Sequence, residues 1–445
     1  MKVVPDELIK DDDKGGSHWG IAALLAALAM VSPFSIDTFY PSFPAIAHEF
    51  SLSAWQIQQS ITVYMLPFAL MTLIQGPLSD ALGRRPVVLV GLLVYTIASI
   101  ACVFAPSFGL LLLFRALQGM SAGVGMAVGR AIIRDLHEGP QAQKLMATIS
   151  MIFGIAPAIA PVLGGWIHVW AGWRFVFGFM SVLGVVLVVT SYLLLPETHP
   201  SERRAQLHIG KLARTVGRIM SNREFMLYAI ALGTTFSAMI TFIGAAPAIV
   251  MGHWHLSETQ FAYLFVPLII GIMGGAFLSG RLAGRIDNTR QIAIGYALAL
   301  SGGALSVLLE AFVASPPILA QQVLITTVAI GVQLMMPIYA LRMLDLFPDV
   351  RGAAASVQSC VMLGIGAIFI GLVVPQLSHS MLALALGSQL LLPGSFLGPL
   401  HPLVLGLLDH VEHRLAHAQE AIDHLRRKDQ AVRRLHLRVL TDGRA

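Results

Sequence analysis

Charged side chains are scarce in this sequence. Asp, Glu, Lys and Arg together make up 12% of the 445 residues, whereas hydrophobic residues make up 56%. Soluble domains carry about a quarter charged residues. The composition therefore excludes an ordinary soluble protein and indicates one that crosses a membrane many times.

Cysteine is almost absent as well. The two cysteines, Cys102 and Cys360, both lie within apolar runs, where thiols usually behave as small hydrophobic groups. No disulfide framework is expected.

Several chemical signatures are missing. The sequence contains no G-x-x-x-x-G-K-[ST] loop for a nucleotide and no H-E-x-x-H motif. One G-x-S-x-G string, Gly119-Met120-Ser121-Ala122-Gly123, lies within an apolar run and not at the strand-to-helix turn that a hydrolase nucleophile requires. We therefore expect neither an enzyme nor an ATP-driven pump, and no cofactor. The formal net charge of +5 comes from basic residues spread over loops between apolar runs. Such residues contact anionic lipid headgroups, whereas nucleic acid would require a concentrated basic patch.

Long apolar runs dominate the chain instead. A membrane-spanning helix needs about 20 mostly apolar residues. This criterion predicts twelve spans, near residues 20–46, 56–79, 86–105, 108–134, 144–168, 172–195, 225–250, 260–282, 290–313, 317–344, 352–375 and 381–407. Lys and Arg occur in every inner loop and in none of the outer loops if the N-terminus is inside, which predicts cytoplasmic termini.

The spans divide into two groups of six. A long basic linker at 196–224 separates residues 19–195 from residues 225–407, with a cytoplasmic tail at 1–18. Leu282-Ala283-Gly284-Arg285 follows span 8 as Leu82-Gly83-Arg84-Arg85 follows span 2. This decayed repeat predicts an all-α membrane protein of two pseudo-symmetric six-helix bundles.

The last segment, 408–445, has a different pattern. Apolar residues recur there at intervals of three and four, and basic residues occupy the opposite face. This pattern predicts an amphipathic cytoplasmic helix that lies on the membrane or self-associates. His413 and His417 have metal-ligand spacing and share a stripe with His410. Because carboxylate or thiolate partners are lacking, we expect no metal site.

Two charged residues lie deep within predicted spans, Asp37 in span 1 and Arg115 in span 4. At ~1.5 Å per residue both fall roughly 10–14 Å below the outer surface, so they are expected to pair. Ionisable groups within spans often mark proton relays. The alternative is an ion pair that only fixes the two spans.

Three short motifs stand out. The turn between spans 2 and 3 contains Gly76, Leu78, Asp80, Gly83, Arg84 and Arg85, span 4 contains Arg115-x-x-Gln118-Gly119, and span 5 contains Pro157, Pro161, Gly164 and Gly165. Asp80 is expected to accept hydrogen bonds from Arg84 and from the first turn of span 11 at Gly352, and Asp135 is the expected second partner of Arg84. The alternative for this turn is a solvated loop that only sets topology.

The turn resembles the signature loop of the major facilitator superfamily, G-x-L-x-D-x-x-G-R-[RK]. The span 4 motif resembles the superfamily's helix 4 motif, and Asp37-x-x-x-Pro41-x-x-Pro44 is similar to helix 1 of its bicyclomycin-resistance branch of bacterial drug:proton antiporters. The resemblance implies proton coupling through Asp37 and Arg115, a latch at the signature loop, rocker-switch alternating access and a bacterial inner membrane.

Span 5 resembles the superfamily's antiporter motif G-P-x-x-G-G, with Ala160 in place of its first glycine. The alternative is a kinked helix that only packs, because prolines bend helices and glycine pairs allow close approach.

The expected substrate is a small amphipathic drug-like compound, cationic or neutral, in a central cavity around one acid. Aromatic and neutral polar residues near mid-span are the candidate lining, namely Tyr40, Gln59, Tyr64, Gln118, Phe153, Phe236, Phe242, Gln333 and Tyr339. The sequence thus favours a proton-coupled multidrug exporter over a metabolite transporter of the same fold, and over a membrane scaffold that uses its tail.

Overall fold

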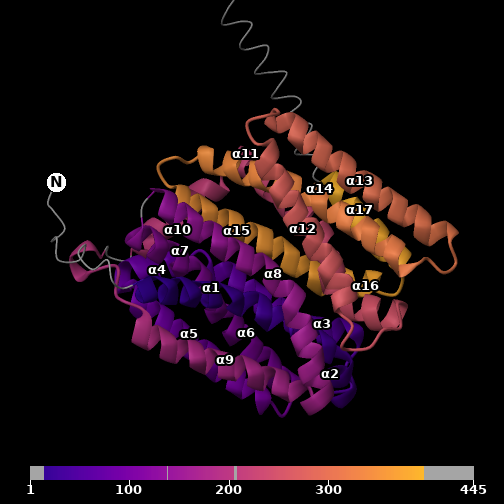
Figure 1. The fold of residues 1–445 in the computed structure, drawn as a ribbon, viewed down its shortest axis with the longest axis horizontal. Coiled ribbons are helices and arrows are strands. Elements are labelled where there is room, and N and C mark those ends of the chain that lie inside the picture. The colour runs from indigo at the N-terminus through magenta and orange to yellow at the C-terminus, as the bar shows by residue number, and fades with distance from the viewer. Residues whose placement is uncertain (1–14, 138, 205–207, 395–445) are drawn as a thin grey trace, which may run out of the picture. The chain divides into compact units, whose positions relative to one another are not determined.

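The computed structural model describes residues 15–137, 139–204 and 208–394. Regular structure in these ranges is entirely helical (Figure 1). The predicted tail helix at 408–445, its histidines and the end of predicted span 12 lie outside the described residues, as does most of the N-terminal tail.

Ten helices of the described chain are long and apolar enough to cross a membrane, or eleven if a bent pair counts as one span. In chain order the helices are α1 (Gly15–Asp37), α2 (Phe43–Glu49), α3 (Ala54–Met71), α4 (Gln75–Leu82), α5 (Arg84–Val103), α6 (Phe108–Ala122), α7 (Val124–Leu136), α8 (Gly139–Ala171), α9 (Trp173–Leu194), α10 (Ile209–Met220), α11 (Arg223–Gly244), α12 (Ala262–Leu282), α13 (Asn288–Phe312), α14 (Ile318–Asp345), α15 (Arg351–Ile368), α16 (Val374–Leu377) and α17 (Met381–Gly394).

Predicted spans 1 to 11 each have a helical counterpart in this series. Span 12 is represented by α17, whose apolar part, Met381–Leu392, is shorter than a span. The predicted total of twelve therefore depends on residues after Gly394.

The signature loop differs from the turn that the sequence predicts. Residues 75–82 form α4, bent by 51° from α3, and only Gly83 separates α4 from α5. Gly83 has φ +101°, and a Cβ there would lie 2.4 Å from the Glu197 carboxylate. A glycine is required here because other residues rarely adopt this backbone. The charged motif is thus held on helix ends.

Helix packing divides the described chain into an earlier and a later group (Figure 1). Helices α1 and α3 to α9 pack among themselves, and so do α11 to α15 and α17. The two groups meet where α3 contacts α15 and where α8 contacts α12. The sequence-based domain boundaries remain a prediction, but this packing is consistent with two halves.

Large apolar side chains are also exposed. Trp170, Leu193 and Phe312 expose 77%, 71% and 82% of their surface. An extensive apolar exterior is unfavourable in water. These faces are suited to lipid.

Part of the linker is helical, which the sequence analysis did not anticipate. Helix α10 packs on α15, and Arg218 of α10 forms an exposed ion pair of 3.2 Å with Asp349. The linker therefore contacts the later group of helices directly.

Candidate functional site

Arg115 is a fully buried cation on α6. Its Nη1 donates to the carbonyl of Ser35 on α1 and to Oε1 of Gln118, both at 3.0 Å. Its Nε donates to the carbonyl of Ser60 on α3 at 3.4 Å. The guanidinium group therefore links three helices through uncharged acceptors.

Aromatic rings surround the same guanidinium group. Its central carbon lies 4.5 Å from the ring centroid of Tyr64, 5.0 Å from that of Phe39 and 5.9 Å from that of Phe177. Cations are attracted to aromatic faces at such distances. We call Arg115 with these three rings the arginine cage. Within the described chain, Nη2 of Arg115 has no hydrogen-bond partner.

Asp37 ends α1 and is 5% exposed. The expected ion pair with Arg115 is not formed: none of the ion pairs or hydrogen bonds between described residues involves the Asp37 carboxylate. The Arg115 guanidinium group is held instead by the carbonyl oxygens of Ser35 and Ser60, by the amide oxygen of Gln118 and by the rings of the arginine cage. Asp37 is thus a buried carboxyl group two residues after Ser35, whose carbonyl binds Arg115.

Gly164 and Gly165 on α8 each permit a close backbone contact. A Cβ on Gly164 would lie 2.0 Å from the carbonyl oxygen of Thr38, the residue after Asp37. A Cβ on Gly165 would lie 2.0 Å from the carbonyl oxygen of Glu258, between α11 and α12. One glycine therefore contacts the end of α1 and the other contacts the later group of helices. Pro157 and Pro161 lie inside α8 on the preceding turns.

Further contacts join the earlier and later groups of helices at the same end of the bundle, which is the end that carries the loop at 50–53. Gln59 on α3 donates to the carbonyl of Gly371 at 2.8 Å, and Gln58 donates to the carbonyl of Gly244 at 3.3 Å. Gly371 lies in a π-helical segment, Phe369–Val373. Such segments interrupt the regular hydrogen-bond ladder and are frequent at functional sites.

The expected ion pairs of Arg84 are both present. The buried guanidinium group pairs with Asp80 and, at 3.0 Å, with Asp135. It also donates to Ser79 at 2.6 Å. In contrast, no described hydrogen bond joins Asp80 to the first turn of α15, and 49% of the Asp80 side chain is exposed. We call Arg84 with Ser79, Asp80 and Asp135 the Arg84 cluster. It therefore lies within the earlier group of helices.

The linker adds two partners that the sequence analysis missed. Glu197 accepts from the backbone N–H of Arg84 at 2.9 Å, and Thr198 donates to Asp135 at 3.0 Å. Arg85 extends away, donating to the carbonyl of Tyr192 at 2.7 Å. No local pattern marks Glu197 and Thr198, because their partners are distant in sequence.

Most of the predicted cavity residues are packed in the interior. Tyr64 belongs to the arginine cage, Gln118 also donates to Ser99 at 2.7 Å, and Tyr339 contacts Tyr296 at 3.0 Å. Tyr40 and Phe242 are buried as well. Gln59 holds the closed end described above, and the remaining two are Phe236 and Gln333, which pack beside Gly366 and Gly275.

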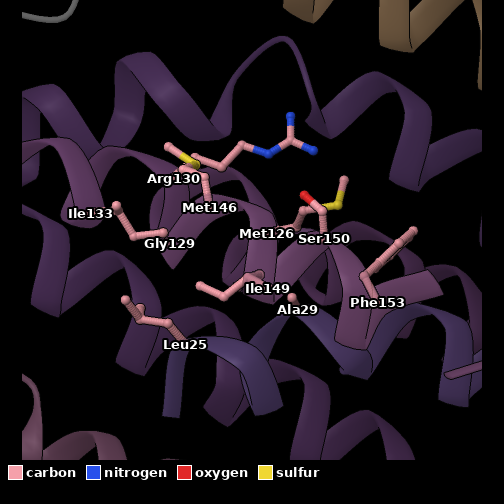
Figure 2. A pocket seen from close by; sticks show the side chains of 11 residues that line it. Leu25, Ala29, Met126, Gly129, Arg130, Ile133, Met146, Ile149, Ser150 and Phe153 are labelled. Atoms are coloured by element: carbon pink, nitrogen blue, oxygen red, sulfur yellow. The ribbon is translucent and has the colours of Figure 1, made fainter. Parts of the chain in front are cut away.

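Of the nine candidates, Phe153 lines an open pocket between α1, α7 and α8, with a cavity volume of about 70 Å³ (Figure 2). The pocket is lined by Leu25, Ala29, Gly125, Met126, Gly129, Arg130, Ile133, Met146, Ile149, Ser150 and Phe153. The sequence analysis missed Arg130 although it falls within span 4. The Gly125-x-x-x-Gly129 spacing beside it was the available signal, since small residues four apart allow close helix contact.

Known proteins resemble this chain along most of its length. Residues 25–406 match the family model of the Major Facilitator Superfamily. A bicyclomycin resistance protein homolog of Haemophilus influenzae is 28% identical over 279 residues, covering 63% of this chain and 70% of the relative. A chloramphenicol resistance protein of Pseudomonas aeruginosa is 27% identical over 361 residues, covering 79% and 85%.

A third relative is the multidrug resistance protein MdtL of Salmonella heidelberg, 31% identical over 236 residues, covering 53% of this chain and 59% of the relative. These matches confirm the resemblance to the superfamily and its bicyclomycin-resistance branch. The family model spans well over half of the sequence, and the chain belongs to the Major Facilitator Superfamily.

Proposed function

We propose that this protein exports amphipathic drug-like compounds in exchange for protons, by rocker-switch alternating access. The bacterial inner membrane is the proposed location, with both termini in the cytoplasm. Relatives named for resistance to bicyclomycin, chloramphenicol and multiple drugs support the substrate class. The observation that supports proton exchange best is the buried, unpaired carboxyl group of Asp37.

A carboxylate taken out of water without a counter-ion costs several kcal/mol. In this arrangement the protonated, neutral form of the Asp37 carboxyl group is therefore favoured over the carboxylate. Arg115 binds the carbonyl of Ser35, two residues before Asp37, and forms no ion pair with the Asp37 carboxylate among the described residues. Release of the proton leaves a buried anion, which favours a conformation that exposes Asp37 to water or to a substrate.

The antiporter motif provides a route from Asp37 to the other half. Gly164 contacts the backbone of Thr38, and Gly165, the next residue, contacts the backbone of Glu258. A change at the end of α1 would therefore alter the seating of α8 on the later helices. This makes Gly164 and Gly165 coupling elements, with Pro157 and Pro161 shaping the helix that bears them.

The two halves, residues 19–195 and 225–407, would tilt about the contacts between them, joined by the linker at 196–224. In the observed conformation the end near the 50–53 loop is closed by Gln58, Gln59 and Gly165. These contacts must break when that end opens. The Arg84 cluster, with Gly76 and Gly83 on its helix ends, would latch the opposite end when Asp80 reaches the first turn of α15.

The test is drug efflux from proteoliposomes driven by a pH gradient. We expect Asp37→Asn to abolish gradient-driven export while binding of the drug persists. The matched control is Glu310→Gln, because Glu310 is a half-buried carboxyl group within α13, far along the chain from the cage. Drugs and then sugars or amino acids are supplied, so a metabolite transporter is also detected. Unchanged export by Asp37→Asn would overturn the proposal.

A further inference from the structure

The pocket between α1, α7 and α8 has apolar walls and a single charged lining residue. Leucine, isoleucine, methionine and phenylalanine side chains form most of its surface, and no acidic side chain of a described residue lines it. Arg130 and Ser150 supply the polar side-chain groups. In Figure 2 the Arg130 side chain reaches along the pocket, with its guanidinium group toward Ser150 and away from Ile133.

Two glycines on α7 create the space. A Cβ on Gly125 would lie 2.4 Å from the carbonyl oxygen of Leu28, so α7 and α1 are in close contact there. One turn later, a Cβ on Gly129 would meet only Cδ2 of Leu25, at the ordinary distance of 3.7 Å. Residues four apart lie on one face of a helix. The helices therefore separate beside Arg130, and the pocket begins there.

Arg130 lacks a counter-ion among the described residues: none of their ion pairs or hydrogen bonds includes its guanidinium group. The acid next along the helix, Asp135, is already bound by Arg84 and Thr198. A guanidinium group stays charged and presents planar donors that match carboxylate, sulfonate or phosphate oxygens. The Arg130 side chain is exposed, so its guanidinium group is accessible to an anionic ligand in the pocket.

We propose that this pocket binds the acidic group of an amphipathic anion at Arg130, with the apolar part of the molecule against Met126, Met146 and Phe153. This deepens the proposed function, on which it rests, by naming a class of transported compound. It differs from the sequence-based expectation of a cationic or neutral compound around one acid, because the described lining of this pocket contains one base.

The test is equilibrium binding of two fluorescent probes to the full chain in phosphatidylcholine nanodiscs. The probes are 8-anilinonaphthalene-1-sulfonate and N-phenyl-1-naphthylamine, which share an aromatic scaffold and differ in the sulfonate. We expect Arg130→Met to weaken binding of the sulfonate about tenfold, as loss of a charge-assisted hydrogen bond would. Binding of the neutral amine should change less than threefold.

Three further variants complete the design. Arg130→Lys should restore most of the sulfonate binding, and Gly129→Leu should weaken both probes because it fills the pocket. Arg285→Met, which removes an exposed arginine outside the pocket, should change neither. Arg130→Gln replaces Arg130→Met if the latter is not monodisperse.

Equal effects of Arg130→Met on both probes, or none on either, would overturn the proposal. So would Gly129→Leu with unchanged sulfonate binding. A second set of nanodiscs contains phosphatidylglycerol, and full displacement of the sulfonate there would identify a lipid headgroup as the occupant and overturn the proposal. These binding measurements apply no pH gradient. Their result therefore does not depend on whether the protein exchanges protons for substrate.

Discussion

Replacing Gly165 by alanine should force the closed end of the protein apart. The new Cβ would lie 2.0 Å from the Glu258 carbonyl oxygen and 2.9 Å from its carbonyl carbon. Ordinary contact begins at 3.4 Å, so the two backbones must separate by about 1.4 Å. Both atoms belong to the main chain and cannot move aside as a flexible side chain would.

Overpacking of this kind typically costs 1–3 kcal/mol. A cost confined to one of two conformations shifts their ratio about 5- to 150-fold. We therefore expect Gly165→Ala to populate a conformation in which the end near the 50–53 loop is open. The protein should still fold, because the clash is relieved when the halves separate.

The assay is a distance measurement between spin labels at Ala54→Cys and Gly252→Cys, with Cys102 and Cys360 replaced by alanine. Both labelled sites are exposed, and a Cβ on Gly252 meets nothing within 4 Å. The control is Gly154→Ala on the same helix, where a Cβ also meets nothing within 4 Å. Identical distance distributions for wild type, Gly154→Ala and Gly165→Ala would refute the reasoning.

Three further substitutions give separate expectations. Gln59→Leu removes the hydrogen bond to Gly371, worth about 1 kcal/mol, and should open the same end several-fold in the spin-label assay. Arg84→Gln leaves the partly exposed carboxylates of Asp80 and Asp135 without their shared cation and should cost about 1–3 kcal/mol, measured by thermal unfolding in detergent. Arg115→Lys keeps the charge but loses the planar fork that bonds to Ser35 and Gln118, and should reduce gradient-driven efflux at least tenfold.

Each of these has a contradicting outcome. An unchanged spin-label distance in Gln59→Leu would show that the Gly371 contact does not hold the end closed. Wild-type unfolding of Arg84→Gln would mean that Asp80 and Asp135 need no counter-ion. Full efflux by Arg115→Lys would show that charge alone suffices in the cage.

Periodicity and charge anticipated much of this molecule. Apolar runs of about 20 residues located the spans, because a helix in lipid must be long and apolar. The partners of Arg84 were predicted from their places in and beside the motifs, since Asp80 lies four residues before Arg84 and Asp135 lies at the inner end of span 4. Local signals of this kind are preserved in the sequence.

Other features depend on backbone contacts between distant segments. The sequence placed Asp37 and Arg115 at similar depth, but it contains no sign that the carbonyls of Ser35 and Ser60 would bind the guanidinium group instead. No local pattern predicts the π-helical segment that contains Gly371. Arg130 was missed because its significance lies in the lack of an acidic partner among the described residues, which no local pattern reveals.

The most direct test of proton exchange at Asp37 is proton release on drug binding, measured with a pH indicator and purified protein in weakly buffered detergent solution. We expect binding of a drug to release protons from wild type and from Glu310→Gln, and to release none from Asp37→Asn at equal drug occupancy. Proton release from Asp37→Asn equal to that of wild type would contradict the account.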